Sequence, residues 1–296
     1  MKKPNIVSLL FFVGIPIGML ILFTYLPFLN VIIDSFFSKT YTANYGFVGL
    51  DNYTFILTNP EYSNAFANSI YYIVAAFIQV ALSLILAVFL CRVRFSTVFK
   101  VLIVLPYMIS GMAIGYIFRL FYTHGYVLDS FLMHLGFELE SLPYWLRDQS
   151  VNNWAIAFAS VWRYTGISLV IFVGAIGSIH RSLFEASWLD GAGSFAQFRY
   201  IIWPSIRFVV IVELFLSVVT SLSEFELPHA IASGGANGTA TYMTHIYRVA
   251  FTERKIGVAS AMTVILLSTI LLAIILITQA GKIWQRIQGA EEGVNA

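Results

Sequence analysis

The stretch Ser69–Leu90, SIYYIVAAFIQVALSLILAVFL, decides the fold class because it is apolar almost throughout and carries no charged residue. A helix needs about 20 mostly apolar residues to cross a hydrocarbon core roughly 30 Å thick. Further runs of this kind lie on both sides of it, separated by polar breaks. The sequence therefore predicts an all-α polytopic membrane protein with six transmembrane helices, near Leu9–Phe36, Ser69–Leu90, Thr97–Phe121, Trp154–Ile176, Ser205–Leu227 and Ile256–Ala280.

The composition agrees with lipid as the main solvent of the chain. Of the 296 residues, 59% are hydrophobic and 11% are charged, whereas soluble domains carry about a quarter charged residues. A formal net charge of +2 argues against a nucleic-acid-binding protein, because such proteins concentrate Lys and Arg on one face. Cys91 is the single cysteine, which excludes an internal disulfide and a CxxC metal site.

Basic residues predict the orientation, because short cytoplasmic loops retain Lys and Arg. With the N-terminus inside, ten of them are cytoplasmic (Lys2, Lys3, Arg92, Arg94, Lys100, Arg181, Arg199, Arg207, Lys282 and Arg286) and five are external (Lys39, Arg147, Arg248, Arg254 and Lys255). Both termini are thus predicted to be cytoplasmic. The first apolar run lacks a small-residue cleavage site, so we expect it to be kept as a helix. The chain divides into residues 1–60 (first helix and outer loop), 61–281 (transport domain) and 282–296 (cytoplasmic tail).

Three connections are predicted on the outer side, at Phe37–Asn68, Tyr122–Asn153 and Pro228–Lys255. All are far longer than the median loop of about 4–6 residues. They have room for short helices and for contact with a partner protein.

One cytoplasmic loop, at 179–204, reads IHRSLFEASWLDGAGSFAQFRYIIWP and predicts two short helices at an angle. Leu183–Leu189 has helical spacing of its apolar residues, and Gly191 is placed for the positive φ that turns a chain after a helix. A second segment follows, and Pro204 is expected to separate it from the fifth membrane helix. Two interpretations fit an amphipathic hairpin at a membrane surface: docking into a groove of another protein, or lying among the lipid headgroups.

The spacing of this loop resembles the EAA loop of permeases in binding-protein-dependent ABC importers. The matching positions are Glu185, Ala186, Ser187, Asp190, Gly191, Ala192, Ile201 and Pro204. Ser187 stands where the family usually has Ala, Trp203 where it has Leu, and His180 where it often has Pro. The resemblance favours docking over the lipid surface.

The resemblance extends to the carbohydrate-importing branch, which includes maltose, glycerol-phosphate and oligosaccharide permeases. It is carried by Trp162-Arg163-Tyr164, Gly125–Asp129, Glu224–Leu227, Gly234-Gly235, Ile246–Arg248 and Gly257–Ala261. Ala236, where that branch often has Pro, departs from the pattern. The similarity covers most of the chain after about residue 60.

The resemblance implies a set of partners in a prokaryotic cell membrane: a second, similar permease, two cytoplasmic ATPases and an external solute-binding protein. In that family the EAA loop sits in a cleft of the ATPase and transmits its closure to the transmembrane cavity. Glu185 and Gly191 would be the most sensitive positions. This chain has no GxxxxGK[ST] phosphate loop. We therefore expect no enzyme activity and no cofactor in it, with ATP and Mg²⁺ bound by the partner ATPase.

Charged residues inside the membrane demand a partner, water or a function, because an isolated one costs at least about 2.5–3.5 kcal/mol on insertion scales. The candidates to line a solute pathway, with polar and aromatic neighbours, are Arg119, Tyr116, Tyr122, Arg163, Tyr164, Glu224, Glu226 and Gln79. Carboxylates and amides suit sugar hydroxyls, and aromatic rings suit the apolar face of a sugar. The alternative is an Arg–Glu network that only holds helices together. Glu213 is expected near the cytoplasmic end of the fifth helix, reaching water.

Two other functions fit the sequence less well. An ion-gradient-driven secondary transporter would also need charges at mid-membrane, but it gives no reason for the Glu185–Pro204 loop, and no inverted repeat is evident. A membrane-embedded enzyme would need a catalytic constellation, whereas the five histidines lie in loops without metal-ligand spacing. The sequence leaves the identity of the solute open.

Overall fold

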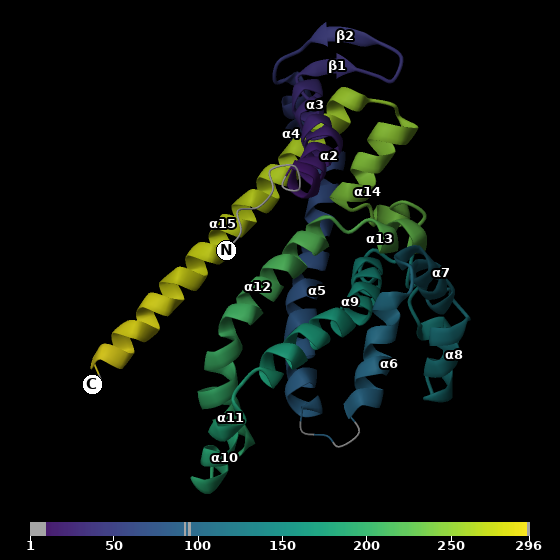
Figure 1. Cartoon of the computed structure of the whole chain (residues 1–296). Helices are drawn as coiled ribbons and strands as arrows, with labels where there is room; N and C mark the ends of the chain where they lie inside the picture. Colours follow the sequence, from purple (N-terminus) through teal and green to yellow (C-terminus); the bar gives the residue numbers. More distant parts are fainter. Residues whose placement is uncertain (1–9, 92, 94–95, 295–296) are drawn as a thin grey trace. The chain divides into compact units, whose positions relative to one another are not determined.

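The computed structural model describes residues 10–91, 93 and 96–294, which are mostly helical (Figure 1). The helices are α2 (Ile15–Leu20), α3 (Leu26–Asp34), α4 (Asp51–Thr58), α5 (Pro60–Leu90), α6 (Ser96–Met108), α7 (Gly111–Phe121), α8 (Val127–His134), α9 (Asn152–Gly177), α10 (Arg181–Leu189), α11 (Ser194–Gln197), α12 (Trp203–Leu222), α13 (Glu226–Ile231), α14 (Tyr242–Tyr247) and α15 (Ile256–Val294). The strands are β1 (Phe37–Lys39) and β2 (Asn44–Phe47). Contacts divide the chain into two compact units, one reaching to Ser63 and including Ile246–Thr269, the other beginning at Asn64 and containing the remainder.

The expected membrane helices are confirmed in number when one bent pair counts as a single span. Five helical stretches are long and apolar enough to cross a membrane, at Phe11–Asp34, Pro60–Leu90, Asn152–Gly177, Ser194–Ile231 and Ile256–Leu276. Among the basic residues used to predict orientation, Lys2, Lys3, Arg92 and Arg94 lie outside the described residues, as do the side chains of Lys282 and Arg286. The sidedness of the termini therefore stays a prediction.

The third expected helix, Thr97–Phe121, is not one straight span. It forms α6 and α7, which are bent by 97° at a short break. Pro106 lies within the last turn of α6 and cannot donate a backbone hydrogen bond. Ser110 then adopts an extended conformation, and α7 starts afresh at Gly111. The structure thus corrects the prediction of a single helix.

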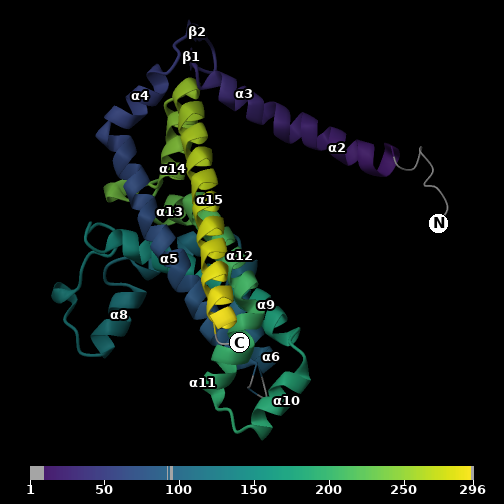
Figure 2. The ribbon, with the colours of Figure 1, turned by 90° about the vertical axis from the view of Figure 1, so that its left-hand side faces the viewer.

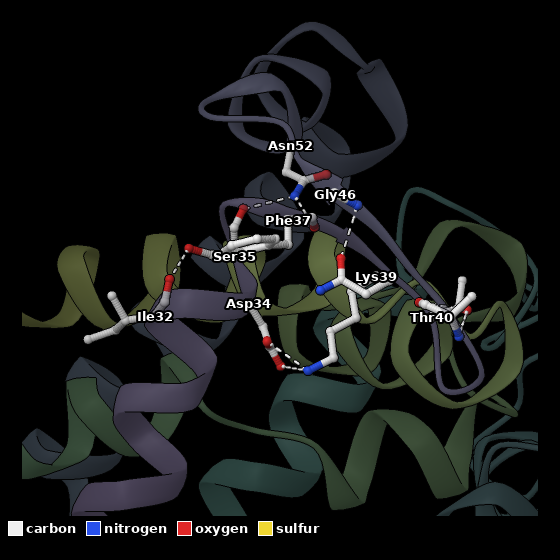
Figure 3. A network of polar contacts seen from close by, with 10 residues as sticks. Ile32, Asp34, Ser35, Phe37, Lys39, Thr40, Gly46 and Asn52 are labelled. Atoms are coloured by element: carbon white, nitrogen blue, oxygen red, sulfur yellow. Dashed lines mark hydrogen bonds and ion pairs between the residues drawn. The ribbon is translucent and has the colours of Figure 1, made fainter.

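The first unit contains a β-hairpin that the sequence patterns did not predict. β1 pairs antiparallel with β2, with Phe37 opposite Phe47. Figure 3 shows the polar contacts that fix its base: Lys39 Nζ binds the Asp34 carboxylate at 2.8 Å, and Asn52 Nδ2 donates to the Phe37 carbonyl at 3.0 Å. These bonds hold the hairpin against the end of α3 and the start of α4.

The second unit is built around two apolar clusters at opposite ends of its helices. One joins Tyr72 of α5 to α7, α9 and α13, and includes Ile114, Ile156 and Leu227. The other joins the C-terminal ends of α5 and α9 to the start of α12, and includes Leu90, Ile176, Ile202 and Ile206. Figures 1 and 2 show α10 and α11 at this second end, beside the C-terminal end of α5 and the N-terminal end of α6.

Close helix contacts in the second unit depend on particular glycines. At Gly166 a Cβ would collide with the backbone of α6 at Ile103 and Val104. At Gly115 a Cβ would collide with Ala230 of α13. These glycines allow α6 to pack along α9, and α7 along α13, at backbone distance.

Candidate functional site

A cavity of about 830 Å³ lies within the second unit, between α5, α9, α12 and the segment that follows α12. Its polar lining comprises Tyr72, Gln79, Tyr107, Ser160, Arg163, Tyr164, Ser168, Glu213, Ser217, Thr220, Ser221, Ser223, Glu224 and Glu226. Besides three tyrosine phenols, the ionisable groups among these described lining residues are one guanidinium and three carboxyl groups. This volume falls in the range of small-molecule sites, which is about 300–1,000 Å³.

A chain of hydrogen bonds from α5 to α12 crosses one part of the cavity lining. Gln79 Nε2 donates to the Tyr164 carbonyl at 3.1 Å and to Ser168 Oγ at 2.5 Å. The Ser168 hydroxyl donates in turn to the carboxylate of Glu213. Gln79 and Glu213 are 3% and 5% exposed, so their polar groups are removed from bulk solvent. Both side chains instead hydrogen-bond to Ser168 of α9.

A second chain joins α9 to the segment after α12. Arg163 Nη1 binds Glu226 Oε2 at 3.0 Å and donates to the Tyr164 hydroxyl at 3.1 Å. The Tyr164 hydroxyl donates to Glu224 Oε2 at 2.9 Å. The backbone N–H of Leu227 donates to the other oxygen of Glu224 at 3.3 Å. Arg163 and Tyr164 thus tie both carboxylates to α9.

The bend between α6 and α7 lies against the Arg163–Glu226 ion pair. Gly111 begins α7, and a Cβ there would collide with the Glu226 carboxylate and the Arg163 guanidinium. The break in the helix and the charged pair therefore meet at one place, which explains why a small residue restarts the helix there.

Two buried lining hydroxyls have no hydrogen-bond partner among the described residues. These are the Tyr72 hydroxyl of α5 and Ser160 Oγ of α9. Tyr72 is 1% exposed and Ser160 is 8% exposed. Buried polar groups are normally paired with protein or ordered water, so both are available to water or to a solute in the cavity.

The structure brings five of the eight predicted pathway residues to the cavity, namely Gln79, Arg163, Tyr164, Glu224 and Glu226. The other three lie elsewhere. Tyr116 and Arg119 are exposed on α7. Tyr122 packs among aromatic side chains next to Phe118, and burial raises the pKa of its phenol above the usual range.

The expectation for Glu213 is wrong. Its side chain is buried and faces the cavity rather than water at a helix end. The physical reason is the length of the helix: the apolar helical stretch runs from Ser194 to Ile231, so Glu213 lies near its middle. The sequence analysis also did not single out three further lining residues, Tyr72, Ser160 and Ser168. A lone polar residue in an apolar run forms no pattern that would mark it.

The loop at 179–204 forms the two predicted arms, α10 and α11. Gly191 has φ of +72°, the left-handed conformation that was expected there. The Ala192 N–H donates to the Ser187 carbonyl at 2.9 Å and the Gly191 N–H to the Trp188 carbonyl at 3.1 Å. This pair of bonds is the Schellman arrangement that ends a helix.

The second arm does not stop at Pro204, in contrast to the expectation. α11 continues through a π-helical turn at Phe198–Ile202 directly into α12. Pro204 lies in the first turn of α12, where its missing N–H is tolerated. The arm and the helix that lines the cavity therefore form one continuous helical path.

The two arms are linked to each other while their outer faces stay exposed. Gln197 Nε2 donates to Ser187 Oγ at 3.0 Å in the buried angle between them. Leu189 and Phe195 are 91% and 79% exposed. Glu185 is exposed, and within the described part of the chain its ion pair is along its own helix, with Arg181 at 3.0 Å. Such exposed apolar groups beside a carboxylate make a surface suited to a protein partner.

Comparison with known proteins gives concordant results. Residues 79–282 match the family described as binding-protein-dependent transport system inner membrane component. The chain is 32% identical over 250 residues to the osmoprotective compounds uptake permease protein GgtC of Synechocystis sp., covering 82% of this chain and 87% of that protein. It is 27% identical over 262 residues to the arabinooligosaccharides transport system permease protein AraP of Bacillus subtilis, covering 86% and 82%.

The fold is also found among solved structures. A chain of the bacterial alginate ABC transporter, crystallised in complex with an alginate pentasaccharide-bound periplasmic protein, aligns with a TM-score of 0.80 and 19% identity over 95% of each chain. At this identity the likeness establishes the shared fold.

Proposed function

Because the chain belongs to the family of binding-protein-dependent transport system inner membrane components, we propose that it is a permease subunit of an ATP-driven importer for a sugar, polyol or oligosaccharide. It is a multi-pass protein of the cell membrane and supplies the pathway rather than the energy. Curated relatives are permeases named for osmoprotective compounds and for arabinooligosaccharides, which supports a hydroxyl-rich solute.

The observation that carries this proposal is the continuous helix from the loop to the cavity. α11 runs without interruption into α12, and α12 carries Glu213 into the cavity lining. From Phe195 to Glu213 the path is about 27 Å at 1.5 Å per residue. A force applied to the arms by a partner is therefore delivered to the cavity wall by one rigid element.

The arms would act on a cytoplasmic ATPase. Leu189 and Phe195 present apolar surface, and Glu185 presents a carboxylate that a partner can engage by exchanging its exposed Arg181 contact. The sequence holds no phosphate-binding loop of its own. ATP and Mg²⁺ thus belong to the partner ATPase pair, whose closure would move the arms, and this chain holds no cofactor.

The remaining partners follow the family pattern: a second permease, which would complete the pathway, and an external solute-binding protein. Basic residues gather on the elements at this end of the second unit: Lys100 lies in the N-terminal part of α6, Arg181 at the start of α10, Arg199 in the π-helical turn and Arg207 in the N-terminal part of α12. This clustering supports a cytoplasmic position for that end by the positive-inside rule, and with it cytoplasmic termini.

Within the cavity, the carboxylates and Gln79 would receive hydroxyl groups of the solute while Tyr107 and Tyr164 offer ring faces. The rival reading of the Arg163–Glu226 pair is a clamp that only fixes α9 against the segment after α12. The two readings differ in what alanine variants do: a solute contact predicts impaired uptake by an assembled transporter, whereas a clamp predicts loss of assembly.

The test is uptake into proteoliposomes that contain the assembled transporter, measured with radiolabelled maltotriose, arabinotriose and lactose in the presence of the solute-binding protein. We expect uptake that requires ATP and is blocked by vanadate. Glu185→Ala should lower uptake while leaving the permease pair assembled. Uptake driven by an ion gradient in vesicles holding this chain alone would instead support a secondary transporter.

A further inference from the structure

Among the described residues, the cavity lining carries more carboxyl groups than basic groups. Arg163 is the single basic side chain among these described lining residues, and it is paired with Glu226 at 3.0 Å. Glu213 and Glu224 also line the cavity. Among the described residues, neither of these two forms an ion pair with a basic side chain.

The two carboxylates are deeply buried, at 5% and 4% exposure, and are held by hydroxyl and backbone donors. Glu213 accepts from Ser168, and Glu224 accepts from Tyr164 and from the Leu227 N–H. Each carboxylate can accept about four hydrogen bonds. Both therefore keep acceptor capacity beyond these bonds, and an ionised carboxylate at this depth repels an anion with little screening by salt.

The two groups are spread along the cavity. Glu213 lies on α12, and Glu224 lies eleven positions further along the chain, two residues beyond the end of that helix. The nine positions from Glu213 to the end of α12 alone span roughly 13 Å of helix. A solute passing this wall meets a carboxylate at two depths, and it also meets the unpartnered hydroxyls of Tyr72 and Ser160. These hydroxyls can donate to or accept from a neutral hydroxyl group equally well.

We propose that Glu213 and Glu224 make this cavity selective for uncharged, hydroxyl-rich solutes and exclude anionic ones such as sugar acids and sugar phosphates. The inference rests on the proposed transport function and narrows its substrate class. Neutral hydroxyls donate to both carboxylates, whereas a carboxylate or phosphate on the solute is repelled at each depth.

The experiment measures the sign of the potential in the cavity without needing the cargo. Thr220 lines the cavity on α12 and is exposed, and Thr58 on α4 is exposed outside it. Thr220→Cys and Thr58→Cys are made separately in a Cys91→Ser chain, which is purified in detergent with its bound subunits. Modification of each thiol is followed by the mass of this chain, using cationic trimethylammonioethyl and anionic sulfonatoethyl methanethiosulfonate.

The modification rate with the cationic reagent is divided by the rate with the anionic reagent at each cysteine. This ratio should be about tenfold or more higher at Thr220→Cys than at Thr58→Cys. Adding Glu213→Gln and Glu224→Gln should remove most of this excess. Equal ratios at the two positions would overturn the proposal, as would an excess that persists in the glutamine variants. If those variants do not fold, the comparison of the two cysteines decides alone.

These readings do not depend on ATP, on uptake or on a solute-binding protein. A cation-selective cavity in a chain that fails the ATP-driven uptake test would refute the transport function while leaving the charge assignment standing. Normal ATP-driven uptake with no difference between the cationic and anionic reagents would refute the charge assignment and leave the transport function standing.

Discussion

Gly191→Ala tests the hinge of the cytoplasmic hairpin with little else disturbed. A Cβ at Gly191 would meet nothing within 4 Å, so the substitution introduces no clash. Its cost comes from holding an L-residue at φ of +72°, which is about 1–2 kcal/mol for the left-handed region. Since about 1.4 kcal/mol is a factor of ten, the hairpin geometry needed for docking should become roughly 5- to 30-fold less populated.

The assay titrates the purified ATPase subunits onto the permease pair in detergent and measures their Kd. We expect Gly191→Ala to weaken binding about 5- to 30-fold and to lower ATP-driven uptake. Gly191→Asn should lie between the wild type and alanine, because Asn visits the left-handed region more readily.

Gly193→Ala is the matched control. Gly193 lies two residues away, also has open space around its Cβ position, and has φ of −71°. It should bind the ATPase like the wild type. An unchanged Kd for Gly191→Ala, or an equal loss for Gly193→Ala, would refute the view that the turn conformation positions the arms.

Three further predictions concern the helix packing, the ion pair and the contact between the two arms. Gly166→Ala should lower the free energy of unfolding in detergent by about 1–3 kcal/mol, because the new Cβ meets the backbone of α6. Gly174→Ala on the same helix, which has open space around it, should leave the free energy of unfolding unchanged. Equal melting temperatures for the two variants would contradict this. Arg163→Ala or Glu226→Ala should impair uptake more than assembly, and loss of the assembled complex on gel filtration would favour the purely structural clamp. Ser187→Ala should lower the stability of the folded loop by about 0.5–1.5 kcal/mol, because it removes the hydrogen bond from Gln197 between the two arms. The effect should be seen as faster proteolysis of the loop. An unchanged cleavage rate would exclude that bond as a stabilising contact.

The parts of the fold that follow from periodicity were predictable. Long apolar runs predicted the spans, and Gly191 after an amphipathic segment predicted the left-handed turn. The bend at Gly111 was missed although Pro106 and Ser110 were both available as signals, because hydropathy alone does not register a change of direction. The β-hairpin at Phe37–Phe47 is too short for an alternation pattern to stand out.

The cavity shows where sequence reasoning ends. Glu224 and Glu226 were recognised because charges near the end of an apolar helix are conspicuous. Glu213 was placed wrongly, since taking Pro204 as a helix boundary shifted its depth. Arg119 was included on the same reasoning, but it is exposed on α7, and no residue of α7 is among the described residues that line the cavity. The depth of a residue along a helix can be counted from the sequence. The direction in which its side chain points is known only once the packing of the helices is known.

The central claim is that the loop at 179–204 couples a cytoplasmic ATPase to the cavity. The most direct measurement is crosslinking from Leu189→Cys, which is 91% exposed at the tip of the first arm, in a Cys91→Ser chain within the assembled transporter. We predict a crosslink to the ATPase subunit, and none from Ser141→Cys in the connection between α8 and α9. Labelling of Leu189→Cys by a membrane-impermeant reagent from outside the cell, or its crosslinking to the solute-binding protein, would contradict the account.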